Sequence, residues 1–373
     1  MDVFQTVACN LRKRRCELHM TQRELAEQIA YSEKAVSKWE TANALPPSSL
    51  LPKLAKILQI SIDALMSSPD DTRYFLGIDG GGTKTEFVLT DEEGRVLGRV
   101  IKGPSNPNDI GYEATCDVLR EGIFEVVGDY PIGNVCAYAG IAGATTANNT
   151  DKMKDFLEKL GLFSVACGSD THNAVSVALC GRDGVAVIMG TGSVAYAQKN
   201  GELFRVGGYG YLIGDSASGF AFGRDAILAA LGAEDGSGAP TCLHALVAEK
   251  LGDEAVLPHL AQFYRGGKRA VAEYAPLVFQ AMQAGDETAC RIVERNMDEI
   301  AHIMAAAVSR LEATPADVVL LGGMTVDAAL FMPILQEKLK ALGCGCRLSV
   351  CRERMVLGAL YLAGLPTHCH LSE

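Results

Sequence analysis

Residues 74–90, YFLGIDGGGTKTEFVLT, contain the pattern from which the fold class can be predicted. An apolar run ends in Asp79, three glycines and a Thr-Lys pair, and a second apolar run follows at once. A P-loop would need Gly-Lys-Ser/Thr in sequence, and a dinucleotide fingerprint would need GxGxxG opening a helix, so both are excluded. Because a DEEG turn at residues 91–94 precedes a further strand-like run over 95–100, the pattern predicts a β-meander whose first turn is the glycine loop.

The same unit occurs a second time. Residues 185–197, VAVIMGTGSVAYA, again place a strand, a Gly/Thr turn and a strand in succession. A third apolar run over 318–321 ends in Gly322-Gly323. This repetition predicts an internal duplication. Two such turns suit a polyphosphate, because glycine lets backbone amides approach the oxygens and Thr or Ser hydroxyls add donors.

Length and composition indicate a globular protein of two or three domains. The chain has 373 residues, of which 48% are hydrophobic and 21% are charged. No apolar run reaches the roughly 18 residues of a membrane span, and the N-terminal sequence has no signal-peptide core, so we expect a cytoplasmic protein without a membrane partner. The twelve cysteines are expected to be reduced thiols. A zinc site remains an alternative for Cys344, Cys346, Cys351, His368, Cys369 and His370.

Charge is unevenly distributed along the chain. The net charge is −11, yet residues 1–68 contain nine Lys or Arg against seven Asp or Glu, which gives +2 and leaves −13 for the remainder. A mildly basic N-terminal region on an acidic body is typical of a small DNA-binding module attached to an enzyme-like domain.

The N-terminal region, residues 4–66, predicts five short helices. Thr21 and Glu24 form a capping-box pattern that opens the second helix. Ser32 can cap the third helix, in which Val36 and Trp39 would face inward. Two short helices joined by a tight turn, the second with a polar outer face, describe a helix-turn-helix.

The strings MTQRELAEQIAYSEKAVSKWE and LPPSSLLPKLAKILQISIDALM resemble the Cro-like (XRE) helix-turn-helix family across residues 1–68. The resemblance implies a recognition helix in the major groove of double-stranded DNA, and binding as a homodimer on two half-sites. The basic run over residues 12–15 is a further candidate for phosphate contacts, with a solvated helix face as the alternative. A helical protein-interaction domain is the alternative for the whole module. The DNA-binding residues implied are Gln22, Ser32, Glu33, Lys34, Ser37 and Lys38.

The remaining motifs are GIDGGGTKTEFVLTD, IMGTGSVAYA, GGYGYLIGDSASGFAFGRDAI and LLGGM. They resemble the actin/Hsp70/sugar-kinase superfamily, and within it the BadF/BadG/BcrA/BcrD ATPases and their N-acetylglucosamine kinase relatives. The fold implied is α/β: a two-lobed actin-like ATPase (ribonuclease H-like) fold preceded by the all-α helix-turn-helix domain. The predicted domains are the head at 1–68, a linker at 69–73, a first lobe at 74–181 plus 353–365, and a second lobe at 182–352.

The resemblance also implies two sets of site residues, with ATP and Mg²⁺ as cofactors and an amino sugar as partner. Asp79 would hold Mg²⁺ through water. The residues implied for ATP and its phosphates are Gly80, Gly81, Gly82, Thr83, Lys84, Thr191, Gly192, Ser193, Gly322 and Gly323. Those implied for the sugar are Ser105, Asn106, Asp170, Gly208, Tyr209 and Asp215.

Asp170 follows a strand-like run over 163–168 and opens a helix. Its position matches the general base that accepts the proton of the sugar hydroxyl, although a helix N-cap would place an aspartate there too. One position departs from the kinase pattern: Val194 follows Gly-Thr-Gly-Ser, where the animal hexosamine kinase has a polar sugar contact.

The resulting hypothesis is a DNA-binding protein whose kinase-like domain phosphorylates an amino sugar such as N-acetylglucosamine, with DNA binding linked to the ligand state. The alternatives are a sugar- or ATP-sensing regulator without turnover, and an ATPase that activates a partner protein. The CxCGxxGCxE signature of ROK proteins and the GGQD segment of the radical-dehydratase activators are both absent from the sequence.

Overall fold

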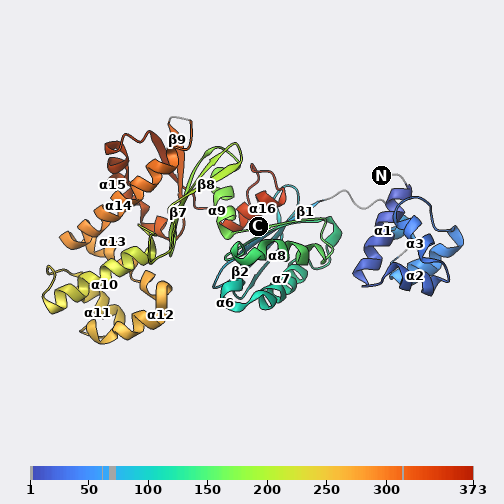
Figure 1. Ribbon diagram of the computed structural model, residues 1–373, viewed down its shortest axis with the longest axis horizontal. Coiled ribbons are helices and arrows are strands. Elements are labelled where there is room, and N and C mark those ends of the chain that lie inside the picture. The colour runs from blue at the N-terminus through green and yellow to red at the C-terminus, as the bar shows by residue number, and fades with distance from the viewer. Residues whose placement is uncertain (1–2, 61, 67–72, 313–314, 373) are drawn as a thin grey trace. The chain divides into compact units, whose positions relative to one another are not determined.

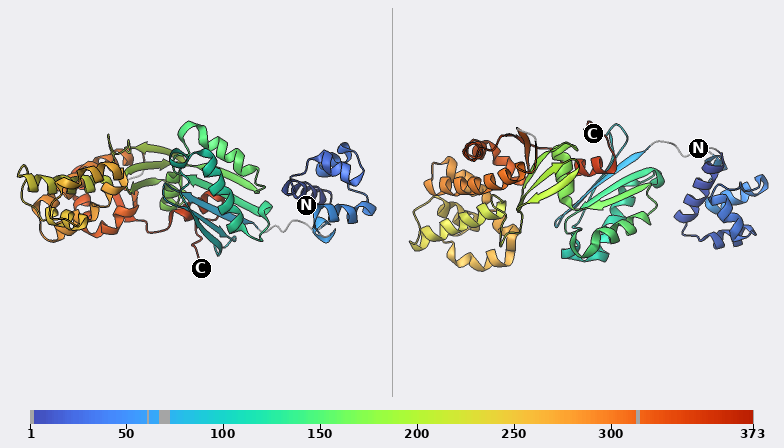
Figure 2. Two further views of the ribbon diagram at one scale, coloured as in Figure 1. Left: turned by 90° about the horizontal axis from the view of Figure 1, so that it is seen from below. Right: turned by 45° about the horizontal axis from the view of Figure 1, so that its top comes forward.

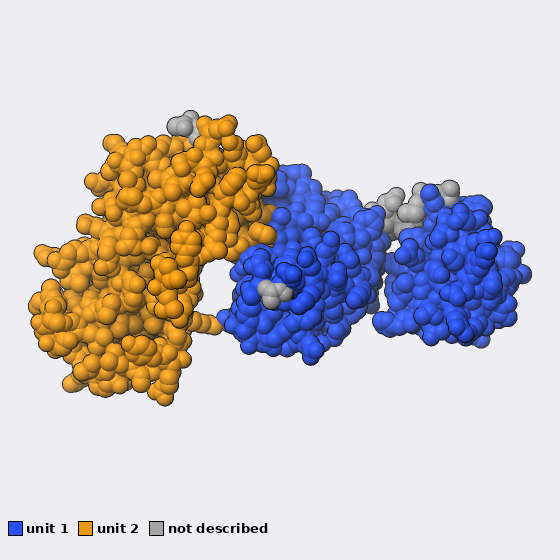
Figure 3. Space-filling view, in the orientation of Figure 1, with its two compact units in different colours: residues 1–170, 359–373 blue, residues 171–358 orange. Residues whose placement is uncertain are grey.

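The computed structural model describes residues 3–60, 62–66, 73–312 and 315–372. The chain divides into two compact units, unit 1 with residues 1–170 and 359–373 and unit 2 with residues 171–358 (Figure 3). Most of the predicted linker, residues 69–73, lies outside the described residues, and the predicted lobe limits stay a prediction.

The N-terminal region forms a bundle of short helices with a core of its own (Figure 1). The predicted capping box is present, since the Thr21 hydroxyl and the Glu24 carboxylate each accept the other residue's backbone amide. Ser32 caps the third helix, and Val36 and Trp39 are buried, as predicted. The elements are α1 (Val3–Glu17), α2 (Gln22–Ile29), α3 (Glu33–Glu40), a 3₁₀ turn (Ser48–Leu50), α4 (Leu51–Leu58) and α5 (Ile62–Met66).

Unit 1 contains a five-stranded sheet in the order β3-β2-β1-β4-β5. The predicted meander is confirmed, because β1 pairs antiparallel with β2 and β2 antiparallel with β3. On the other side, β1, β4 and β5 are parallel. The strands are β1 (Tyr74–Gly80), β2 (Thr85–Thr90), β3 (Val96–Lys102), β4 (Val135–Ile141) and β5 (Ser164–Gly168). The helical elements are α6 (Pro107–Ile110), α7 (Tyr112–Val127), α8 (Asn149–Glu158) and two 3₁₀ turns (Ile132–Asn134 and Thr146–Asn148). The helix α9 (Asp170–Leu179) begins at Asp170, the last residue of the first segment of unit 1. The helix α16 (Met355–Ala363) begins in unit 2 and ends in unit 1.

Unit 2 repeats this topology. Its sheet has the order β10-β9-β6-β7-β8, with β6, β7 and β8 antiparallel in sequence and β6, β9 and β10 parallel. The two sheets therefore share one connection pattern, which confirms the duplication expected from the two Gly/Thr turns. The strands are β6 (Gly184–Met189), β7 (Ser193–Lys199), β8 (Glu202–Val206), β9 (Ala316–Leu321) and β10 (Cys346–Val350).

The helices of unit 2 pack together beside its sheet (Figure 2). With the sheet they build the main core of the unit, around side chains such as Phe222, Phe279 and Phe331. Glycine lets two of these helices approach closely, because a side chain on Gly223 of α10 would overlap the Val271 backbone of α12. Within the described residues, no helix is both long and apolar enough to cross a membrane. The helices are α10 (Gly219–Asp235), α11 (Leu243–Leu251), α12 (Leu260–Ala272), α13 (Ala275–Gln283), α14 (Glu287–Val308) and α15 (Ala328–Ala341), with 3₁₀ turns at Leu257–His259 and Gly323–Asp327.

Candidate functional site

The glycine loop of unit 1 lies at the carboxyl end of β1. The Gly81 amide donates to the Lys84 carbonyl over 3.0 Å, which closes a tight turn. Gly82, Thr83 and Lys84 are exposed, whereas Gly80 is buried at the end of the strand. The loop thus presents three of the predicted phosphate-binding residues to solvent, and Gly80 has a packing role.

Gly80 makes room for Ser105. A Cβ at residue 80 would overlap the Ser105 hydroxyl, and the Ser105 side chain is fully buried. Among the residues that the structure describes, this hydroxyl has no hydrogen-bond partner. The Ser105 amide donates to the Gly81 carbonyl over 3.0 Å, so the residue joins the glycine loop to the loop that follows β3.

Asn106 occupies the predicted acceptor loop next to this junction. Its Oδ1 accepts from the Asn108 amide at 3.0 Å, and its Nδ2 donates to Asp109 Oδ2 at 2.7 Å. A Cβ at Gly143 would overlap Asn106 Oδ1, so that glycine allows the amide to sit there. Asp109, which the sequence did not single out, also approaches the glycine loop, since a Cβ at Gly82 would lie 3.1 Å from its Oδ2.

The structure brings Asp79 and Asp170 to the same edge of the sheet. In the parallel register, Asp79 pairs with Gly140 and Gly140 with Gly168, so the three form one row across β1, β4 and β5. Asp170 comes two residues after Gly168 and is the first residue of α9, as predicted. It is half-buried, and its Oδ1 accepts a hydrogen bond from the Ser169 hydroxyl at 2.9 Å. The carboxyl edge of parallel strands is where open α/β sheets bind ligands.

The matching turn of unit 2, Gly190 to Ser193, is fixed to the start of α10. The Gly190 carbonyl accepts from the Gly219 amide at 2.8 Å, and the Thr191 carbonyl accepts from the Phe220 amide at 3.2 Å. Ser193 Oγ donates to the Ser216 carbonyl at 2.6 Å. An exposed Thr191 therefore sits at the positive end of a 17-residue helix, which favours an anion.

Gly322 and Gly323 lie beside this turn. Strands β6 and β9 are parallel with Ile188 opposite Leu321, so their carboxyl ends meet. Gly322 has a φ of 105°, and a Cβ there would lie 2.6 Å from the Met189 carbonyl, so only glycine fits without strain. Gly323 is exposed, with open space where a Cβ would be. The structure therefore brings all the predicted phosphate and adenosine residues of unit 2 to one edge.

The predicted sugar residues of unit 2 lie in the segment after β8. A Cβ at Gly208 would overlap Val194, so Gly208 packs directly on the residue that departs from the kinase pattern. Tyr209 projects outward with 68% of its surface exposed, and the Arg205 guanidinium is 5.9 Å from its ring centroid. Asp215 is buried and has a left-handed backbone with φ 63°.

The outer face of α3 carries the predicted DNA-reading residues. Glu33, Lys34 and Lys38 are exposed, Ser37 is half-exposed, and Ser32 caps the helix through a bond from the Ala35 amide. Gln22 Nε2 donates to Glu40 Oε2 at 2.7 Å, so that side chain is held against α3.

Two of the four basic residues over 12–15 have internal partners. Arg14 binds Glu17 and the Leu58 carbonyl, and Arg15 binds Glu40. Their side chains therefore help to hold the helices together, a role that the sequence alone did not indicate.

Comparisons with known proteins match both parts of the chain. The model of the BadF/BadG/BcrA/BcrD ATPase family matches residues 76–341, and a helix-turn-helix model matches residues 11–65. The chain belongs to the BadF/BadG/BcrA/BcrD ATPase family. It carries a helix-turn-helix domain ahead of its ATPase domain.

Proteins similar to this chain include sugar kinases. The chain is 33% identical over 257 residues to the N-acetylmuramic acid/N-acetylglucosamine kinase of Clostridium acetobutylicum, covering 66% of this chain and 83% of the relative. It is 30% identical over 234 residues to the N-acetyl-D-glucosamine kinase of Dictyostelium discoideum, covering 57% and 72%. A crystal structure of a candidate N-acetylglucosamine kinase from Chromobacterium violaceum superposes with a TM-score of 0.60 at 25% identity, covering 79% and 99%. The predicted two-lobed kinase fold is thereby confirmed.

The sequence did not single out Lys268 of the ATPase domain. Its Nζ lies 3.0 Å from Asp215 Oδ2, although 53 residues separate the two along the chain. The helix α12 is broken at Gly267, where φ is 62° and ψ is −158°, directly before Lys268. The Gly266-Gly267 pair inside a helical pattern was the one available signal of this break.

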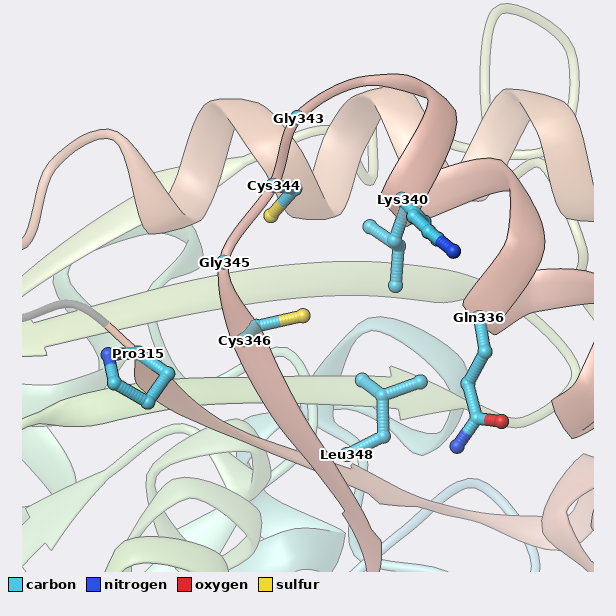
Figure 4. Close-up of a pocket in the computed structure, with 9 residues that line it drawn as sticks. Pro315, Gln336, Lys340, Gly343, Cys344, Gly345, Cys346 and Leu348 are labelled. Atoms are coloured by element: carbon cyan, nitrogen blue, oxygen red, sulfur yellow. The ribbon is translucent and has the colours of Figure 1, made fainter.

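The alternative zinc site is not supported. Within the described residues, no group of three or more His, Cys, Asp or Glu side chains is placed to hold a metal ion. Cys344 and Cys346 line an open cavity of about 470 Å³ between α15 and β10, together with Lys340 (Figure 4). Burial and the neighbouring Cys344 raise the pKa of Cys346 to about 12, so that thiol stays protonated. Cys369 belongs to unit 1, where its thiol donates to the Glu92 carbonyl.

Proposed function

We propose that the chain is an ATP-dependent kinase of an amino sugar, such as N-acetylglucosamine, whose helix-turn-helix head binds double-stranded DNA. The observation that carries the kinase is the edge of the unit 1 sheet, where Asp170 follows the strand row that contains Asp79. The sugar-kinase activity of the relatives supports the same reaction.

Phosphoryl transfer requires a base, a correctly oriented sugar hydroxyl and neutralisation of the negative charge on the phosphates. The sugar hydroxyl gives its proton to the Asp170 carboxylate while its oxygen forms a bond to the terminal phosphorus of ATP. The bond from that phosphorus to the bridging oxygen breaks, and ADP leaves. Asn106 offers its amide to the sugar, and Tyr209 offers an exposed ring to a pyranose face.

The two Gly/Thr turns supply the phosphate contacts. Thr83 and Thr191 are both exposed at turns whose glycines keep side chains out of the way. Asp79, half-buried at the end of β1, offers the carboxylate oxygen that Mg²⁺ prefers. When bound, Mg²⁺ supplies neutralisation of the phosphate charge.

The head is proposed to read DNA as a homodimer. Its exposed α3 carries Glu33, Lys34 and Lys38 on one face, the arrangement that a recognition helix needs in a major groove. Helix-turn-helix dimers bind two half-sites about 34–36 Å apart, so an operator of that spacing is expected. Occupancy of the kinase domain by its ligands is proposed to change the affinity for this operator.

The decisive experiment is ADP release from MgATP by the full chain, first without sugar and then with N-acetylglucosamine, N-acetylmannosamine, glucosamine and glucose in turn. We expect release that depends on an N-acetylated or free amino sugar. Release that is equal with and without sugar would point instead to an ATPase that activates a partner. Failure of every sugar to promote release would contradict the kinase.

A second candidate function, ligand sensing without turnover, is favoured by Val194. Its side chain packs against Gly208, so an apolar group stands where the kinase pattern has a polar sugar contact. In the ADP-release experiment, this candidate predicts no release, while ATP or sugar still raises the melting temperature of the chain.

The DNA contact is tested by replacing Lys34 and Lys38 together with Ala. We expect the affinity for an operator selected from random DNA to fall at least about tenfold, because each base-edge contact contributes roughly 1–3 kcal/mol. Fluorescence anisotropy with labelled operator measures the change. The matched control replaces Lys53 and Lys56, two exposed lysines of α4, and removes the same charge. Equal losses in both variants would mean that α3 does not read the sequence.

A further inference from the structure

Lys268 lies against the phosphate turn of unit 2. A Cβ at Gly192 would be 2.7 Å from Lys268 Nζ and 2.6 Å from Asp215 Oδ2, so the ion pair rests on the face of that glycine. The Lys268 side chain is 32% exposed and that of Asp215 is 5% exposed. A partly exposed cation therefore covers a buried carboxylate directly beside the turn.

The Asp215 side is fixed. Its Oδ1 accepts from the Gly210 amide at 3.2 Å, and the following backbone is held from two other elements. Ser193 of β7 binds the Ser216 carbonyl, and Asn296 of α14 accepts from the Ala217 amide at 3.0 Å. Because several groups anchor this segment, the Asp215 carboxylate keeps its place.

The Lys268 ammonium, the other half of the ion pair, can move to a different partner. The backbone of α12 is held to α10 by the close approach of Gly223 to Val271, one turn beyond Lys268. The ammonium, however, is attached through a flexible four-carbon chain, and it also lies near the Tyr211 ring, with 5.9 Å between Nζ and the ring centroid. A compact point charge on such a chain is suited to follow a phosphate oxygen.

We propose that Lys268 is a phosphate-binding residue that exchanges partners. Without nucleotide it pairs with Asp215; when a phosphate occupies the Thr191–Ser193 turn, the ammonium moves to a phosphate oxygen. This inference rests on the proposed function and adds a residue to its nucleotide site.

The exchange couples the two substrates. A buried carboxylate that loses its cation needs another hydrogen-bond donor, and a sugar hydroxyl is one. Nucleotide binding therefore makes the Asp215 carboxylate available, and the sugar binds more tightly after the nucleotide than before it. The coupling is reciprocal, as linkage requires.

Isothermal titration of the full chain with MgAMPPNP, with and without N-acetylglucosamine, tests the exchange. We expect Lys268→Gln to weaken MgAMPPNP at least about tenfold, because a charge-assisted hydrogen bond is lost. Lys268→Arg should recover most of that affinity. In the unchanged chain, saturating MgAMPPNP should strengthen N-acetylglucosamine binding about fivefold or more, and Lys268→Gln should remove this dependence.

Two further variants test whether the loss of MgAMPPNP affinity in Lys268→Gln comes from misfolding or from the removal of any positive charge. Lys250→Gln removes an exposed lysine of the same unit, which donates to the Glu273 carbonyl, and should bind MgAMPPNP normally. The double variant Asp215→Asn with Lys268→Gln leaves no buried unpaired charge and should still bind MgAMPPNP weakly.

The outcomes are distinct. If the unchanged chain binds MgAMPPNP and Lys268→Gln binds it equally well, Lys268 is not a phosphate ligand, while the proposed kinase stands. If the nucleotide affinity falls but sugar binding never depends on nucleotide, the exchange with Asp215 is wrong. If the unchanged chain binds no nucleotide, this inference and the proposed function both fail.

Discussion

Replacement of Asp170 by Asn is expected to lower kcat for sugar phosphorylation by about 10²- to 10⁴-fold, the range that a positioned general base contributes. Asn has nearly the same shape and keeps an oxygen at Oδ1, so it can still accept the bond from the Ser169 hydroxyl. The variant should therefore fold normally and lose only the ability to take up the proton. KM for both substrates should change little, because the interaction that is removed acts mainly in the transition state.

Sugar-dependent ADP release measures this effect, with Asp151→Asn as the matched control. Asp151 is exposed on α8 in the same unit, and its replacement removes the same charge. A normal rate for the Asp170 variant would show that another group takes the proton, without contradicting kinase activity. A fall in kcat equal to a fall in folded protein would assign Asp170 a structural role.

The meanders and their turns could be predicted from sequence because each depends on neighbouring residues. Glycine at Gly82 and Gly192 marks a turn, and the apolar runs beside it have the length and composition of strands. The two sheets follow from the repetition of this unit. The position of Asp170 at the start of a helix could be predicted in the same way, because a strand and a helix flank it, whereas its role as a base was implied by the family resemblance.

The contacts that were missed join residues distant in the chain. The Lys268–Asp215 pair joins residues that are 53 positions apart. It depends on the break of α12 at Gly267, which sets the direction of the Lys268 side chain, and the hydrophobic periodicity of the sequence does not predict that direction. The family resemblance of the loop around Ser105 implied that this residue faces the sugar. Its burial follows from the missing side chain at Gly80, because the loop after β3 packs on the end of β1, and neither sequence segment by itself shows this contact.

The head contains a second contact of this kind. Arg15 of α1 binds Glu40 at the end of α3 through two hydrogen bonds, at 2.6 Å from Nε and 2.9 Å from Nη2, across 25 residues. Gln22 of α2 binds the same carboxylate, and Arg15 also donates to the Met20 carbonyl. The bond to Glu40 raises the pKa of Arg15, so the guanidinium stays charged. One buried carboxylate thus joins α1, α2 and α3 of the helix-turn-helix domain.

Arg15→Ala is accordingly expected to destabilise the head by about 3–5 kcal/mol, because it leaves Glu40, 1% exposed, as a buried charge without its cation. A domain of this size has a total stability of only about 3–10 kcal/mol, so DNA binding should be largely lost. Trp39 is the single tryptophan of the chain and is buried in the head, against Tyr31. Tryptophan fluorescence during urea unfolding of the full chain therefore reports on the head alone.

The exposed Arg23–Glu27 pair of α2 is the control for the buried Arg15–Glu40 pair. It shows whether the loss of stability comes from the burial of Glu40 or from the loss of any ion pair. Its side chains are 76% and 65% exposed and solvent screens their charges, so Arg23→Ala should leave the urea midpoint of the head almost unchanged. Sugar-dependent ADP release should be unchanged in both variants, because the core of the head contains only residues of the head. Equal urea midpoints for the Arg15 and Arg23 variants would mean that hydrogen bonds from water or Gln22 stabilise the Glu40 carboxylate well enough without Arg15. Loss of kinase activity together with the head would show instead that the ATPase domain depends on the head for its own folding.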